Sequence, residues 1–264
     1  MMDLLPYAAL IAVIGGFVDL DSTAAWQFMV SQPLVAAPLT GLALGFFANE
    51  VDYGLRLGLM VGTILQLVWI EQLPLGMNIP PDAALASVLS VALGYLGGKS
   101  FDTFLEREVC STAALLIAVA LGLVGRSMDI WLRKINTYAD RLILSSLESG
   151  NPRWLEFGHF TCAMLTFFKA FLFCFITVML GVEPLRYFTQ SLNFNQCTGF
   201  IVIQGLLPVI GFAVLATKLI NTRREAFSAI GGILLFTFLP AYLWLALVAG
   251  FVMFWRHLHI KSSA

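Results

Sequence analysis

Charged residues are scarce in this sequence: they make up 12% of its 264 residues, about half the share that is usual in soluble domains. So few charges cannot cover the surface of a soluble protein. The 15 Lys and Arg residues nearly balance the 16 Asp and Glu residues, which leaves no basic excess for nucleic acid. Hydrophobic residues account for 59% of the chain, and its mean hydropathy is +0.86. This composition indicates an integral membrane protein.

Cysteine and histidine are also rare, and neither forms a reactive pattern. The 4 Cys residues include no Cys-x-x-Cys pair and lie mostly in or beside apolar stretches, which favours small core residues over disulfides or a metal site. No Ser/His pair, paired Asp or His-metal spacing occurs within the apolar stretches. We therefore expect no catalytic residue, no metal and no cofactor, so the chain is not itself an enzyme.

Apolar blocks alternate with short polar breaks, as in proteins that cross a bilayer several times. The first block follows a start without Lys or Arg, so we expect a retained membrane helix rather than a cleaved signal. Pro240 divides the last block, which indicates a hairpin or a kinked helix. The blocks are Leu4–Val18, Leu34–Ala48, Tyr53–Ile70, Ala83–Leu96, Val109–Val124, Phe157–Leu180, Gly199–Ala216 and Ala226–Phe254.

Several of these blocks are shorter than the about 20 apolar residues that a membrane span needs, and two of them, Leu34–Ala48 and Ala83–Leu96, suit re-entrant or broken helices. Short apolar segments interrupted by Gly or Pro are typical of re-entrant or broken helices beside a transporter's binding site. The alternative is ordinary tilted helices whose ends are hard to place. Both alternatives give the same fold class, an all-α polytopic membrane protein.

Glycines recur every four residues in the first half of the chain. Gly54, Gly58 and Gly62 form one stripe, and Gly41 with Gly45 repeats the spacing. On a helix these residues share one face, which lets a neighbouring helix approach closely. We therefore predict close helix packing at these positions.

The stretch 126–153 breaks the apolar pattern, because charged residues alternate there with apolar ones at helical spacing. It predicts an amphipathic helix at the membrane surface or an arm between two membrane bundles. We expect one membrane domain, 1–264, made of a half 1–125 with a motif region 27–87, the arm, and a half 154–264. Five basic residues favour the cytoplasmic side for the arm: Arg126, Arg133, Lys134, Arg141 and Arg153.

Lys169 lies in the middle of an apolar block, where a charge is costly and tends to be functional. It needs a partner carboxylate, a lipid headgroup or water. An internal salt bridge is the favoured interpretation, and a ligand contact is the alternative.

The richest polar stretch is 66–87, where an apolar helix breaks at Pro74 and Gly76 and apolar sequence resumes after Asp82. Its amide and carboxylate groups offer hydrogen bonds to a neutral polyhydroxyl ligand, and Trp69 offers a face for a sugar ring. The structural alternative for Asp82 is capping of the helix that follows it. The hydrogen-bonding residues in this stretch are Gln66, Glu71, Asn78 and Asp82.

Two segments carry a resemblance to a known family. Residues 81–87 read Pro-Asp-Ala-Ala-Leu-Ala-Ser, and residues 27–45 contain Gln-Phe-Met-x-Ser-x-Pro followed by Pro-Leu-x-Gly-x-x-x-Gly. Both resemble segments of the IIC component in the mannose/fructose/sorbose family of bacterial sugar phosphotransferase systems. They occur in the same order and at a compatible distance, and they cover about the first 100 residues.

The resemblance implies a multi-pass subunit of the bacterial inner membrane that binds a hexose or amino sugar and moves it inward. Its implied partners are a IID membrane subunit, in a homo-oligomer of IIC–IID units, and cytoplasmic IIA and IIB proteins, of which IIB phosphorylates the sugar. The implied fold has re-entrant hairpins and a core that moves against a scaffold, as in an elevator. By position, the sugar-facing candidates are Gln27, Gln66, Asn78 and Asp82.

The sequence also departs from the family pattern at several positions. Gln32 stands where the family has Arg, Phe46 where it has an acidic residue, and Gln66 where it has Glu, while residues 71–74 are unusually polar. These changes leave the identity of the sugar open. They also keep two alternatives in view: a non-transporting IIC-like sensor or regulator, and an unrelated multi-spanning transporter.

Overall fold

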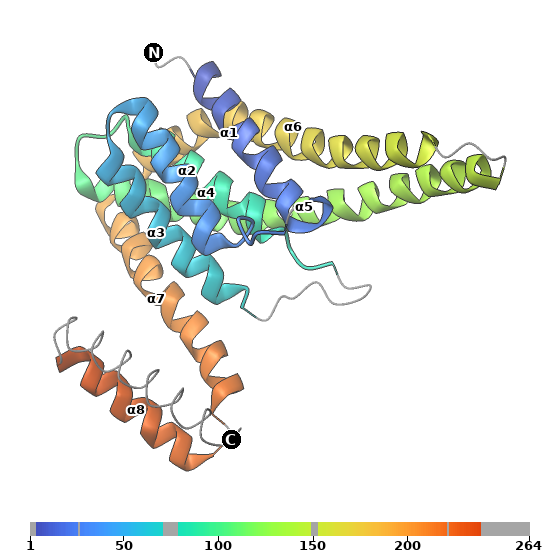
Figure 1. Ribbon diagram of the computed structural model, residues 1–264. Coiled ribbons are helices and arrows are strands. Elements are labelled where there is room, and N and C mark those ends of the chain that lie inside the picture. Colours follow the sequence, from blue (N-terminus) through green and yellow to red (C-terminus); the bar gives the residue numbers. More distant parts are fainter. Residues whose placement is uncertain (1–3, 26, 71–78, 149–152, 221, 239–264) are drawn as a thin grey trace. The chain divides into compact units, whose positions relative to one another are not determined.

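The computed structural model describes residues 4–25, 27–70, 79–148, 153–220 and 222–238, and the regular elements within these ranges are all helical. The chain forms two compact units, Met1–Val214 and Leu215–Ala264. The predicted break at Pro240 lies outside the described residues. The elements are α1 (Leu5–Asp19), η1 (Leu20–Ala24), α2 (Pro33–Ala48), α3 (Val51–Val68), α4 (Ala83–Gly98), α5 (Phe104–Glu148), α6 (Arg153–Ser191), α7 (Phe194–Leu219) and α8 (Arg223–Phe238) (Figure 1).

In the described part of the chain, 5 helical segments are long and apolar enough to cross a membrane. They confirm the predicted all-α, multi-spanning fold class. The two blocks singled out as candidates for re-entrant or broken helices form α2 and α4, each of 16 residues. At 1.5 Å per residue each measures about 24 Å, less than the about 30 Å of a hydrocarbon core. The candidate spans are Leu5–Ser22, Val51–Val68, Phe104–Glu148, Leu155–Ser191 and Phe194–Thr217.

Helices α2 and α3 form a tight hairpin. Asn49 ends α2 in the left-handed conformation, with φ of 58°, and α3 begins two residues later. The backbones of the two helices touch along the glycine stripe: a Cβ added to Gly58 would lie 2.6 Å from the carbonyl oxygen of Ala37. The predicted close packing of the glycines is therefore confirmed, and side chains at these positions would separate the two helices.

Helix α4 is enclosed by protein. Every residue from Ala84 to Gly98 is buried, and α4 packs against α1, α2, α3, α5 and α6. Its small residues allow this close approach from several directions. Asp82 caps its N-terminus by accepting a hydrogen bond from the backbone N–H of Leu85 at 2.9 Å. A short helix can stay at membrane depth in this setting because protein, not lipid, surrounds its ends.

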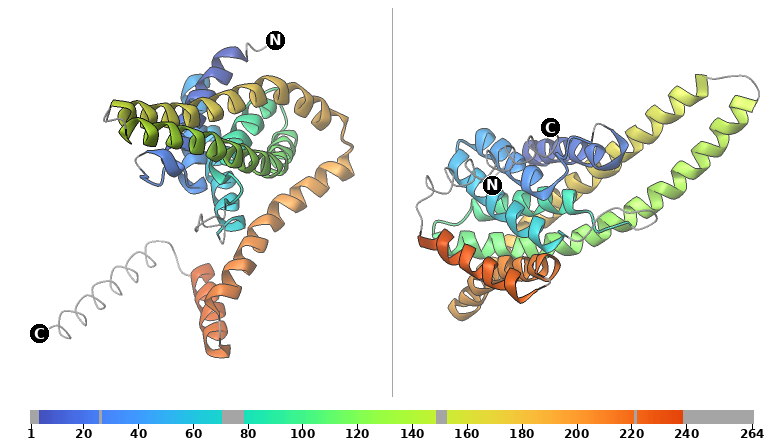
Figure 2. Two further views of the ribbon diagram at one scale, coloured as in Figure 1. Left: turned by 90° about the vertical axis from the view of Figure 1, so that its right-hand side faces the viewer. Right: turned by 60° about the horizontal axis from the view of Figure 1, so that its bottom comes forward.

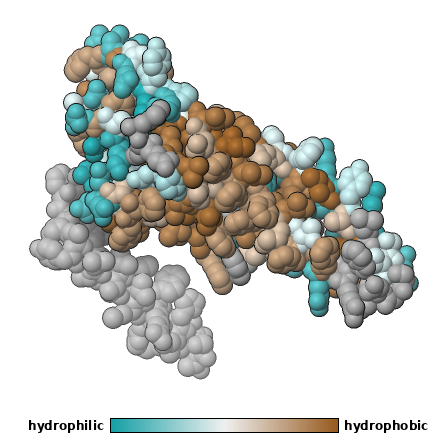
Figure 3. Space-filling model, turned by 90° about the horizontal axis from the view of Figure 1, so that it is seen from above, coloured by the Kyte–Doolittle hydropathy of each residue, from teal (hydrophilic) through white to brown (hydrophobic). Residues whose placement is uncertain are grey.

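The polar stretch after residue 125 belongs to α5, which continues without a break from its apolar part to Glu148. The 45 residues of α5 span about 68 Å, so the helix extends far beyond a bilayer core. The views in Figures 1 and 2 agree that α6 returns beside this extension, so the two helices form an arm. Figure 3 shows hydrophobic side chains over the middle of one face and a polar mixture toward the arm on the right.

Candidate functional site

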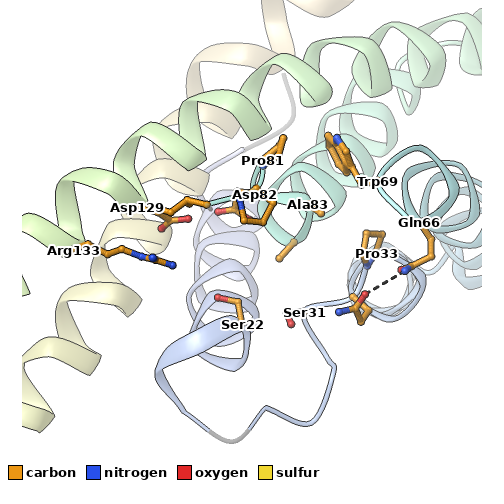
Figure 4. A pocket seen from close by; sticks show the side chains of 14 residues that line it. Ser22, Ser31, Pro33, Gln66, Trp69, Pro81, Asp82, Ala83, Asp129 and Arg133 are labelled. Carbon is orange, nitrogen blue, oxygen red and sulfur yellow. Dashed lines mark hydrogen bonds between the residues drawn. The ribbon is translucent and has the colours of Figure 1, made fainter. Parts of the chain in front are cut away.

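A small polar cavity of about 150 Å³ lies where the ends of several helices meet. The turn η1, the start of α2, the end of α3 and the start of α4 contribute to it, and one turn of α5 completes the wall (Figure 4). An apolar bundle thus encloses a site rich in hydrogen-bonding groups. The polar and aromatic residues that line it are Ser22, Ser31, Gln32, Gln66, Trp69, Asp82, Asp129 and Arg133.

The two carboxylate oxygens of Asp82 have different roles: one caps a helix, and the other is free to accept a hydrogen bond from a ligand. Its backbone N–H donates to the carbonyl oxygen of Gly122 at 2.9 Å, and its Oδ1 caps α4 through Leu85. Its Oδ2 is buried and has no hydrogen-bond partner among the described residues. Gly125 makes room for this arrangement, because a Cβ there would lie 2.7 Å from the Cβ of Asp82. The capping role and a ligand-binding role are therefore compatible.

Gln66 and Gln32 form an amide pair at the cavity wall. The side-chain nitrogen of Gln66 donates to the side-chain oxygen of Gln32 at 3.2 Å, as the dashed line in Figure 4 marks. The side-chain oxygen of Gln66 accepts from the backbone N–H of Leu34 at 3.4 Å, which ties α3 to the start of α2. Gln32 and Gln66 stand where the family resemblance implies Arg and Glu, and the structure shows that they contact each other. The cavity therefore has a neutral amide pair where the family pattern implies an Arg–Glu ion pair.

The turn that leads into α2 is held by Asp21. Its carboxylate accepts hydrogen bonds from the backbone N–H groups of Phe28 at 2.6 Å and Ser31 at 2.9 Å. Asp21 lies in η1, a π-helical turn, and such turns are frequent at functional sites. This anchoring places Ser31 at the cavity wall just before α2 begins.

A buried ion cluster lies behind the cavity. The ammonium of Lys169 is 2.9 Å from Oδ2 of Asp19 and also forms an ion pair with Asp129. Lys169 and Asp19 are 8% and 3% exposed, so the pair is shielded from solvent. The favoured internal salt bridge is confirmed. Because three helices supply these groups, the cluster fixes α1, α5 and α6 against one another.

Within the described residues, Asp19, Asp82 and Asp129 are close enough by spacing to share a metal ion, since one carboxylate oxygen from each lies within 4.8 Å of the others. The ammonium of Lys169 already supplies positive charge to two of these carboxylates. We therefore assign the cluster to an internal ion pair and not to a metal.

The structure brings together some of the residues that the sequence predicted. Gln66 and Asp82 line the same cavity, 16 residues apart in the chain, with Trp69 between them. Gln27 is exposed, with φ of 55°, and is not among the lining residues. Asn78 lies outside the described residues.

Sequence reasoning missed the contribution of α5, because it placed the stretch 126–153, with Asp129 and Arg133, in an amphipathic surface helix or arm and not beside the cavity. A signal was present: Gly122, Gly125 and Asp129 are three and four residues apart, so they share a face of one helix. The two glycines of that face are the ones that contact Asp82.

Comparison with known proteins agrees with this fold. The family model described as the sorbose-specific IIC component of the phosphotransferase system matches residues 5–255. The fructose permease IIC component of Bacillus subtilis is 24% identical over 203 residues, which are 77% of this chain and 69% of that protein. The mannose-specific EIIC component of Escherichia coli K12 is 22% identical over 220 residues, 83% of this chain and 72% of that protein.

Two solved structures share the fold. A structure described as a membrane protein aligns with a TM-score of 0.71 at 20% identity, covering 98% of this chain and 96% of that one. The mannose transporter ManYZ, solved with microcin E492, aligns with a TM-score of 0.56 at 19% identity, covering 96% and 94%. The family match removes the alternative of an unrelated multi-spanning transporter. The chain belongs to the sorbose-specific IIC family of the phosphotransferase system and is a multi-pass protein of the bacterial inner membrane.

Proposed function

We propose that this chain binds a neutral hexose or amino sugar in the cavity beside Asp82 and moves it inward for phosphorylation. The observation that carries the proposal is the convergence of Gln66, Trp69 and Asp82 on one polar cavity inside an apolar bundle. A hydrogen-bonding cavity at the ends of short helices is the arrangement that transporters use for polar ligands. The family membership supports the same conclusion.

The cavity offers each kind of contact that a sugar needs. The unpartnered Oδ2 of Asp82 accepts a hydrogen bond from a hydroxyl, and the amides of Gln32 and Gln66 supply both donors and acceptors. The indole of Trp69 gives a flat apolar face for the ring. Gln27 and Asn78 stay predictions from the family resemblance.

The proposed partners follow from the family. We infer that a IID subunit covers part of the membrane face, that IIC–IID units form a homo-oligomer, and that IIB, charged by IIA, phosphorylates the sugar at the cytoplasmic side. We also propose an elevator-like movement. This movement follows from the family resemblance, which implies a core that moves against a scaffold.

The test replaces Asp82 by Asn in the full complex with its partner subunits. Asn also caps helices, so Asp82→Asn keeps the start of α4 while it removes the carboxylate. A hydrogen bond to a charged group contributes about 1.5–3 kcal/mol, so sugar affinity falls roughly 10- to 100-fold. Equilibrium binding of radiolabelled mannose, fructose, sorbose and amino sugars gives the affinity, and uptake with phosphorylation gives the transport rate.

The matched control is Asp102→Asn, which changes an exposed carboxylate beyond the other end of α4. It keeps normal binding and uptake. Unchanged sugar affinity in the Asp82→Asn protein would remove Asp82 from the site. Normal uptake of every tested sugar by cells that lack the chain, together with altered gene regulation, would favour the sensor alternative instead.

A further inference from the structure

A second polar cavity adjoins the first. It measures about 280 Å³ and lies between η1, the polar part of α5 and the first turns of α6. Ser22, Asp129 and Arg133 line both cavities, so these three side chains form the partition between them. The remaining residues that line the second cavity are Ala24, Leu132, Asn136, His159, Cys162, Ala163 and Thr166.

The chemistry of the second cavity suits a sugar that is passing through. Asn136, His159 and Thr166 supply an amide, an imidazole and a hydroxyl, and the side-chain oxygen of Asn136 is buried with no hydrogen-bond partner among the described residues. The first cavity has Trp69 and the buried carboxylate of Asp82, whereas no Trp, Tyr or Phe among the described residues lines the second. A sugar therefore finds hydrogen bonds there but weaker overall binding.

The two sides of the partition differ in how firmly they are held. Asp129 is fixed by its ion pair with the buried ammonium of Lys169. Arg133, one turn further along α5, is exposed and forms no ion pair with any carboxylate that the structure describes. Its long side chain can swing without losing an ionic partner, so Arg133 is the movable side of the partition.

The order of the cavities along α5 gives the direction. Asp82 contacts α5 at Gly122 and Gly125, the partition follows at Asp129 and Arg133, and Asn136 comes one turn later. The arm carries five basic residues, of which Arg141 and Arg153 lie beyond this point, and basic residues favour the cytoplasmic side. The second cavity thus lies between the first cavity and the side where phosphorylation takes place.

Resting on the proposed function, we propose that this second cavity is a transit site through which the neutral sugar leaves the Asp82 cavity toward the cytoplasm, with Arg133 as the movable partition. The site lowers the barrier for release and adds nothing to the affinity of the first cavity. Blocking it therefore slows translocation while sugar binding beside Asp82 persists.

The native cysteines provide a probe that avoids folding defects. Cys162 is half-buried and lines the second cavity, whereas Cys110, Cys174 and Cys197 are buried. A small methanethiosulfonate reagent applied to inside-out vesicles of the assembled complex transfers its thioalkyl group to the Cys162 sulfur and releases a sulfinate. Mass spectrometry measures the extent of modification.

We expect modification to lower the uptake rate by about tenfold or more while the dissociation constant of the sugar changes little. This combination indicates that a step after binding has been slowed. The Cys162→Ala protein, compared with its own untreated rate, is insensitive to the reagent. A second variant, Asn136→Leu, removes hydrogen bonds at similar size and lowers the maximal uptake rate without weakening binding.

Full modification of Cys162 with unchanged uptake would overturn the transit site and leave the proposed function standing, provided that Asp82→Asn still loses affinity. Loss of sugar binding upon modification would also overturn it, since the two cavities would then act as one. Absence of sugar binding by the untreated complex would overturn the proposed function itself.

Discussion

Helices α4 and α7 are both apolar, yet they meet opposite surroundings. Protein encloses α4 on every side, from Ala84 to Gly98, whereas only 6% of the 18-residue apolar window within the span Phe194–Thr217 is buried. The difference lies in side-chain size: α4 is rich in Ala, Ser and Gly, and α7 presents large side chains such as Leu206 and Ile210, which are 54% and 56% exposed. In a bilayer, where lipid is as apolar as leucine, small residues mark the buried helix better than hydrophobicity does.

The strongest test of this contrast is a bulky side chain at a glycine of each helix. In α4, a Cβ at Gly94 would lie 3.2 Å from the Cα of Ser111, so the backbone of α5 would have to shift, while a Cβ at Gly205 in α7 meets nothing within 4 Å in the described part of the chain. Gly94→Leu is expected to cost about 3 kcal/mol or more of folding free energy through overpacking. Gly205→Leu leaves stability unchanged. Thermal unfolding in detergent compares the two, and equal midpoints would contradict the contrast.

A smaller effect is expected from truncating one leucine in each helix. Leu85 in α4 is fully buried, so Leu85→Ala leaves a cavity, whereas Leu206→Ala removes a side chain that faces outward. In the cores of soluble proteins, Leu→Ala lowers the free energy of unfolding by about 2–5 kcal/mol. For Leu85→Ala we expect roughly half of that loss, because detergent or lipid solvates leucine well in the unfolded protein. Unfolding of the two purified proteins measures the difference. A Leu206→Ala protein as unstable as Leu85→Ala would show that a further surface covers α7.

The smallest effect concerns a polar group in α4. The hydroxyl of Ser90 is buried without a hydrogen-bond partner among the described residues, whereas the hydroxyl of Ser87 donates to the carbonyl oxygen of Ala83 at 2.6 Å. Ser90→Ala therefore stabilises the protein by up to about 1 kcal/mol, and the matched Ser87→Ala costs about 0.5 kcal/mol. A destabilised Ser90→Ala protein would indicate that Ser90 contacts a ligand or partner.

The sequence predicted the helices of the first half well, because each begins or ends at a local signal. Pro33 opens α2, Asp82 caps α4, and the glycine stripes of α2 and α3 predict close packing, although they do not name the partner helix. The arm was harder. Helical spacing persists through the polar stretch after residue 125, so periodicity alone does not tell a separate surface helix from the continuation of α5 that the structure shows.

The candidate site was predicted only in part, because some of its residues are far apart in the sequence and come together only when the helices pack. Gln66 and Asp82 flank one break, so proximity in sequence brings them together. Asp129 joins them because α4 packs on α5, and Lys169 reaches Asp19 across 150 positions. Charge balance predicted that Lys169 needed a partner, but it left open which carboxylate meets it.

The position of Lys169 limits how the molecule can move. Parting its ammonium from Asp19 or Asp129 would strand an ion in a medium that hardly solvates it, at a cost of several kcal/mol. During a conformational cycle, α1, the adjoining part of α5 and α6 therefore travel or rest as one block. Any sliding surface must therefore lie outside the contacts among these three helices.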